Sequence, residues 1–120
     1  MVYANVLASF DQSDDLRKFA TAFFSAIGAS AFERRESSGY ASGFYFRARH
    51  DGLNFNVSLS DEEGFEKFPF WIQVSSETST QDELGAAVRS LLDSPALQKG
   101  FHFALVQNFG KRDAKIIFQR

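Results

Sequence analysis

The side chains best suited to binding chemistry are Arg47 and Arg49, which alternate with apolar residues along the stretch Phe44 to His50. Residues two apart in an extended strand point to the same face of a sheet, so these two arginines should lie side by side. A planar guanidinium binds carboxylates and phosphates through paired N–H donors. Two adjacent guanidiniums would form a fork for such an anion.

Neither histidine occurs in a pattern that supports catalysis or metal binding. His50 precedes the dipeptide Asp51-Gly52, His102 lies in an apolar run, and the chain contains no H-x-x-x-H, G-x-S-x-G or phosphate-loop sequence. Because adjacent strand residues point to opposite faces, we expect His50 and Asp51 not to form a dyad. We predict no catalytic residues and no enzymatic activity.

The segment DEEGFE places four carboxylates within six residues, on Asp61, Glu62, Glu63 and Glu66. It lacks the alternating ligands of an EF-hand loop. Only Phe65 is available to fix the segment against the rest of the protein. We therefore expect a solvated acidic loop, with no bound metal and no cofactor.

The composition predicts one ordinary domain over residues 1–120. The chain is 44% hydrophobic and contains fifteen phenylalanines, so it can bury a hydrophobic core without the support of disulfides or a metal. The absence of cysteine excludes disulfides and thiolate chemistry. A net charge of −2 argues against a nucleic-acid binder. The chain has no apolar stretch long enough for a membrane span and no signal-peptide pattern, so we expect a cytoplasmic protein with no membrane partner.

The hairpin from Phe44 to Leu59 is the most strongly specified element. Asp51-Gly52 is a preferred dipeptide for a two-residue type I′ turn. Centring the turn there sets Ala48 opposite Phe55 on an apolar face. The same register sets the polar pairs, Arg47 with Asn56 and Arg49 with Asn54, on the other face. A slip of one residue would reverse both faces, so the register is fixed by the pattern.

Helical spacing and capping residues predict two helices among the remaining strands. The first covers residues 14–27, with Ser13 as its N-cap and Gly28 after its end, and the second begins with the capping-box pair Thr80 and Glu83. Strands are expected at residues 2–10, 31–36, 68–75, 101–109 and 114–119. The resulting order β-α-β-β-β-β-α-β-β predicts an α+β two-layer sandwich, with both helices packed on one face of a mostly antiparallel sheet.

The opposite, outer face of the sheet is the candidate binding surface. We expect it to be solvated and to expose Trp71, although an exposed tryptophan is uncommon on a surface without a partner. Tyrosine, tryptophan and arginine are enriched at protein interfaces. Together with the acidic loop, the candidate residues are Tyr45, Arg47, Arg49, Asn54, Asn56, Trp71, Gln73, Asp61, Glu62 and Glu63.

These features favour a non-enzymatic protein-binding module, such as a small bacterial inhibitor or immunity-type protein. Two alternatives remain open at this point. A secretion-chaperone-like or adaptor domain would have the same elements and would dimerise, so the protein is expected to be a monomer or a homodimer. A helix-grip-like domain would instead line a small apolar ligand pocket with its phenylalanines.

Overall fold

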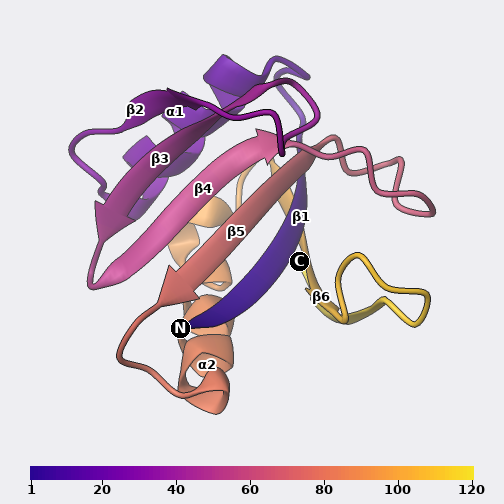
Figure 1. Cartoon of the computed structure of the whole chain (residues 1–120). Helices are drawn as coiled ribbons and strands as arrows, with labels where there is room; N and C mark the ends of the chain where they lie inside the picture. The colour runs from indigo at the N-terminus through magenta and orange to yellow at the C-terminus, as the bar shows by residue number, and fades with distance from the viewer.

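The computed structural model describes all 120 residues and has the predicted two-layer α+β architecture. One antiparallel seven-stranded sheet has the strand order β2-β3-β4-β5-β1-β6-β7. Both helices lie behind the sheet in Figure 1, and the loops after β4 and β6 project from the same side of the molecule. The elements are β1 (Val2–Phe10), α1 (Leu16–Ile27), β2 (Glu33–Glu36), β3 (Phe44–His50), β4 (Leu53–Leu59), β5 (Phe70–Ser76), α2 (Gln81–Leu92), the 3₁₀ turn η1 (Pro95–Leu97), β6 (Phe101–Gln107) and β7 (Lys115–Gln119).

The hairpin of β3 and β4 has the predicted register. Ala48 pairs with Phe55, Arg47 with Asn56 and Arg49 with Asn54. Asp51 and Gly52 both have positive φ, at 50° and 77°, as a type I′ turn requires. The residues at this tip therefore confirm the turn that the dipeptide predicts.

The first helix starts later than predicted, because Asp15 and not Ser13 is its N-cap. The Asp15 carboxylate accepts a hydrogen bond from the Lys18 amide at 3.0 Å, which satisfies one of the free N–H groups of the first turn. The Ser13 hydroxyl instead accepts from the Asp15 amide at 2.9 Å and shapes the preceding turn. Gly28 ends the helix at φ 85°, as expected for a left-handed C-terminal residue.

The second helix has the predicted capping box at its N-terminus. The Thr80 hydroxyl accepts from the Glu83 amide at 3.1 Å, and the Glu83 carboxylate accepts from the Thr80 amide at 2.7 Å. The hydrogen bond from the Thr80 backbone lowers the pKa of Glu83, because it stabilises the charged carboxylate. Both orphan N–H groups are thus satisfied by side chains.

Four strands differ from their predicted bounds, and the smallest difference is in the strand expected at 114–119, which begins at Lys115. The strand expected at 31–36 begins only at Glu33, and the one expected at 68–75 spans Phe70–Ser76, after Pro69. The strand expected at 101–109 ends at Gln107, where the chain turns through Asn108 at φ 59°. β6 is apolar on both faces for most of its length, because it lies between β1 and β7 and is covered on both sides.

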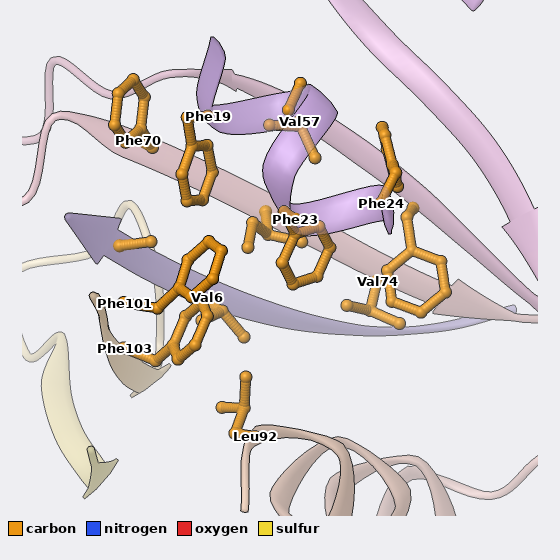
Figure 2. Packing of buried hydrophobic residues seen from close by; sticks show 14 of the residues in the cluster. Val6, Phe19, Phe23, Phe24, Val57, Phe70, Val74, Leu92, Phe101 and Phe103 are labelled. Carbon is orange, nitrogen blue, oxygen red and sulfur yellow. The ribbon is translucent and has the colours of Figure 1, made fainter. Parts of the chain in front are cut away.

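The main core lies between the helices and the inner face of the sheet and is built largely from phenylalanine. Figure 2 shows Phe19 and Phe23 of α1 directed toward Phe70, Phe101 and Phe103 on the strands. The rings of Phe19 and Phe70 are parallel with their centroids 4.2 Å apart. Offset or edge-to-face aromatic pairs add stabilisation beyond the apolar area that they bury.

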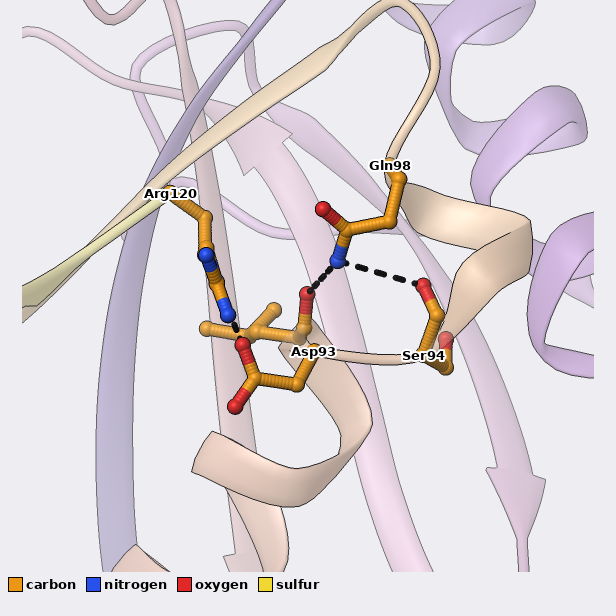
Figure 3. Close-up of polar contacts among 5 residues, drawn as sticks. Asp93, Ser94, Gln98 and Arg120 are labelled. Carbon is orange, nitrogen blue, oxygen red and sulfur yellow. Dashed lines mark hydrogen bonds and ion pairs between the residues drawn. The ribbon is translucent and has the colours of Figure 1, made fainter.

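The C-terminal residue is tied to the end of α2. The Arg120 guanidinium contacts the carboxylate of Asp93, the residue that caps α2 (Figure 3). The Gln98 side-chain amide donates to the carbonyls of Leu92 and Ser94 across η1.

None of the helices has the length and apolar character that crossing a bilayer requires.

Candidate functional site

The outer face of the sheet is only partly solvated, which corrects the prediction of a uniformly wet face. Asn54 and Ser75 are buried, and Ser58 has no exposed surface. The loops between strands fold back over this face and place apolar side chains on it. A second apolar cluster forms there from Leu7, Phe68, Ala104 and Val106, with Phe65, Trp71, Phe109, Ala114 and Ile116 packed against it.

Trp71 is half-buried, so the prediction of an exposed tryptophan is wrong. Its ring stacks on Phe109, with centroids 4.9 Å apart, and lies 5.6 Å from the Tyr40 ring. Its indole N–H donates to the Asn5 side-chain oxygen at 3.0 Å. Trp71 therefore acts mainly as a packing residue of the outer cluster, and its polar atom is already satisfied within the chain.

Four aromatic rings form a continuous row across the outer face. Tyr45 stacks on Tyr40 at 4.5 Å between ring centroids, and Tyr40 leads on to Trp71 and Phe109. Tyr40 comes from the loop between β2 and β3, while the other three belong to β3, β5 and the loop after β6. Burial raises the pKa of Tyr40, and the hydrogen bond that its oxygen accepts from the Asn56 amide partly offsets this.

Beside the aromatic row, the strands align a row of amide side chains. Asn56 is opposite Gln73, and Gln73 is opposite Asn5 on β1. The side-chain oxygen of Asn56 is buried and accepts no hydrogen bond, and the hydroxyl of Ser58 is likewise unpartnered. Buried polar atoms usually have a hydrogen-bond partner, so these two atoms are exceptions within the sheet.

Next to these rows, three arginines line one surface pocket of about 440 Å³, together with Ala31, Phe32, Glu33, Ala48 and Asn54. The three are Arg35 of β2 and Arg47 and Arg49 of β3. The pocket lies at the sheet edge where β2 begins. We refer to Arg35, Arg47 and Arg49 with these neighbours as the arginine pocket.

Internal contacts occupy two of the three guanidiniums. Arg35 donates to the Glu33 carboxylate at 2.7 Å and 3.0 Å, and this hydrogen bond raises the pKa of Arg35 further. Arg49 donates to the Asn54 side-chain oxygen at 3.3 Å. The side chain of Arg47 has no hydrogen bond and no ion pair, although Glu33 is its cross-strand partner. The guanidinium of Arg47 is therefore free to take an external acceptor.

The acidic loop does not belong to this site. Asp61, Glu62 and Glu63 follow the far end of β4, whereas Arg49 and Asn54 flank the hairpin turn at its near end. Seven strand residues separate the two ends, a length of roughly 20 Å. Phe65 and Phe68 anchor the loop on the outer apolar cluster. The candidate residues from the sequence thus divide into a basic and an acidic surface.

Two histidine–aspartate contacts were not expected from the sequence. His50 and Asp51 lie 3.4 Å apart, because Asp51 belongs to the turn and not to a regular strand. His102 contacts Asp11 at 2.9 Å, and Ser9 is its cross-strand neighbour on β1. These three residues have the types of a catalytic triad. However, no hydrogen bond joins Ser9 to His102, and the His102 side chain is 52% exposed to solvent.

Two further pockets lie beside α2. One of about 650 Å³ is bordered by Tyr3, Arg89 and Ile117 where α2 diverges from β1, β6 and β7. The other, of about 340 Å³, lies between α2 and the hairpin tip at His50 and Leu53. No group of three or more histidine, cysteine, aspartate or glutamate side chains is arranged to hold a metal ion. The arginine pocket has the most concentrated charge of the three pockets.

Sequence reasoning missed two residues of this site, Tyr40 and Arg35. Tyr40 lies between two glycines in a turn, and no periodicity signals that its ring returns to the sheet. Strand alternation places Arg35 on the opposite face from Phe32 and Arg34. Only the pairing of β2 with β3 shows that this is the face of Arg47. Comparison of the chain with protein-family models, with curated proteins and with solved structures gives no match.

Proposed function

We propose that this protein is a non-enzymatic protein-binding module that contacts its partner through the outer face of its sheet. One observation carries the proposal: the stacked pair Tyr45 and Tyr40 lies beside the arginine pocket, since Tyr45 is the cross-strand partner of Arg35, and the guanidinium of Arg47 in that pocket has no internal partner. Aromatic and arginine anchors of this type dominate binding energy at protein interfaces.

A small inhibitor or immunity-type protein is the form of this function that we favour, in a cytoplasmic setting consistent with the lack of cysteine. Such a protein needs a rigid surface more than it needs a reactive group. The stacked rings and the hairpin of fixed register provide one. A preorganised surface loses less conformational freedom when it binds.

The apolar-ligand alternative receives less support from the packing. A helix-grip-like site would require the core phenylalanines to border a cavity. Among the three surface pockets described above, only the one at the hairpin tip includes a fully buried phenylalanine, Phe55. Elsewhere the rings stack on one another, as Phe10 does on Phe101 with centroids 4.8 Å apart.

The test uses affinity capture from the native lysate, followed by titration of the identified partner against purified variants. The face variant combines Tyr45→Ala with Gln73→Ala, and the control combines Thr21→Ala with Ser25→Ala on the exposed side of α1. We expect the face variant to bind at least about tenfold more weakly and the control to bind as the wild type does. Equal affinity for wild type and face variant would exclude this face as the binding surface.

A further inference from the structure

We propose that the arginine pocket binds an extended acidic segment of the partner protein, with carboxylates at alternate positions. This inference rests on the proposed function and specifies the chemistry of the partner. Its basis is the charge of the pocket, the spacing of its arginines and their place at a sheet edge.

The charge of the pocket opposes that of the whole chain. Its lining has three positive side chains and one negative, which leaves a net charge of +2, whereas the chain carries −2. The one carboxylate, on Glu33, is already bonded to Arg35. Charge of one sign concentrated in a concave site attracts a ligand of the other sign. The ligand is therefore anionic.

The spacing of Arg47 and Arg49 sets the form of the ligand. They are two residues apart on the same face of β3, so their Cα atoms lie about 6.5–7 Å apart. An extended peptide repeats its own side chains at the same interval. Carboxylates at positions i and i+2 would meet the two guanidiniums in register, one at the paired donors of Arg47 and one at the donors of Arg49 that Asn54 leaves free.

The edge position of the pocket favours a peptide over a single small ion. β2 begins only at Glu33, so the last residues of β3 extend beyond the paired region that ends at Glu33 and Arg47. Ala31 and Phe32, which directly precede β2, line the pocket together with the arginines. An extended strand can lie along such an edge and present alternate side chains to the sheet face.

The experiment follows the arginine Nε–Hε resonances of the ¹⁵N-labelled protein by NMR at low salt. The probe is a capped peptide with the sequence Gly-Ser-Glu-Ser-Glu-Ser-Gly, and the matched peptide has glutamine in place of both glutamates. We expect the glutamate peptide to bind at least tenfold more tightly than the glutamine peptide. We also expect its affinity to fall as salt is added. The resonances of Arg47 and Arg49 should shift most.

The pocket variant combines Arg47→Ala with Arg49→Ala, and its matched control removes the same charge from the loop after β6 with Lys111→Ala and Arg112→Ala. The pocket variant should bind the glutamate peptide at least tenfold more weakly, and the control should be unchanged. The backbone NMR spectrum of each variant verifies that it is folded. A loss of affinity in both variants would mean attraction by net charge alone and would overturn the proposal.

Two further measurements separate this ligand from other sources of negative charge. Inorganic phosphate that binds the pocket more tightly than the glutamate peptide would overturn the proposal in favour of a phosphate site. Self-association that disappears in the pocket variant would overturn it in favour of the chain's own acidic loop. If the identified partner still binds the pocket variant but not the face variant, the acidic-segment inference fails while the proposed function stands.

Discussion

Phe46 shows how a single side chain of the hairpin supports the core. It is 2% exposed, with its ring edge-to-face against Phe32 and Phe44 and the Arg17 guanidinium 5.1 Å from its centroid. Truncation of Phe46 to alanine should lower the free energy of unfolding by about 3–5 kcal/mol, because it removes buried surface and leaves a cavity. Urea unfolding measures this. A loss of unfolding free energy below about 1 kcal/mol would contradict the assignment of Phe46 to the core. Tyr3→Ala, at an exposed position, serves as the control.

Tyr40 should make the stability depend on alkaline pH. Burial raises the pKa of its phenol, so above the ordinary tyrosine value of about 10 the folded state holds a proton that the unfolded state has lost. The stability that the neutral Tyr40 phenol contributes is therefore fully present below about pH 10. It is lost as the pH rises through the pKa of Tyr40 in the folded state. Urea unfolding from about pH 8 to about pH 11 should show a smaller loss in Tyr40→Phe than in the wild type. Parallel curves for the two proteins would show that Tyr40 does not carry this dependence.

At the scale of single residues, the sequence predicts the sheet face to which a side chain points better than it predicts how exposed that side chain is to solvent. Alternation placed Tyr45, Arg47 and Gln73 on the outer face, where the structure has them. It did not predict that Ser58 on the same face would be buried. Direction follows from the strand period, which is local, whereas burial here depends on loops that return from distant parts of the chain. For the same reason the aromatic partner of Tyr45 was not recognised.

Among the elements, α2 depends on the reciprocal hydrogen bonds at its start. Thr80→Ala removes the hydroxyl that accepts from the Glu83 amide, and it should cost about 0.5–2 kcal/mol of unfolding free energy. Thr80→Ser keeps an acceptor at the same place and should cost less. Thermal and urea unfolding of the two variants test this. If the serine and alanine variants were equally destabilised, the cap hydrogen bond would not be the cause.

Capping residues in the sequence are sufficient to locate the start of α2 but not the start of α1. Thr80 and Glu83 form the only threonine–glutamate pair at box spacing before an apolar stripe, and α2 begins there. Before α1, Ser13, Asp14 and Asp15 all have side chains that can cap a helix. The choice among them depends on the turn that leaves β1, where the Ser13 amide donates to the Phe10 carbonyl. The sequence pattern alone does not encode that turn.

At the scale of the molecule, the basic and acidic surfaces lie at opposite ends of the central hairpin. The arginine pocket lies near its turn, and Asp61 to Glu66 follow the far end of β4. Such a separation produces a dipolar field, which orients a charged partner before contact even when the net charge is small. The proposed acidic segment would approach the pocket end and be repelled from the loop end.

The order of the strands predicts how stability is distributed through the sheet. β1 is paired on both sides, with β5 and β6, and its Leu7 and Ala8 are fully buried. β2 is a four-residue edge strand in which every residue is exposed. Amides exchange with solvent through local opening, which costs least at exposed edges. Native-state hydrogen exchange followed by NMR should therefore find the slowest amides in β1 and much faster ones in β2. Equal protection of the two strands would mean that the sheet opens only as one unit.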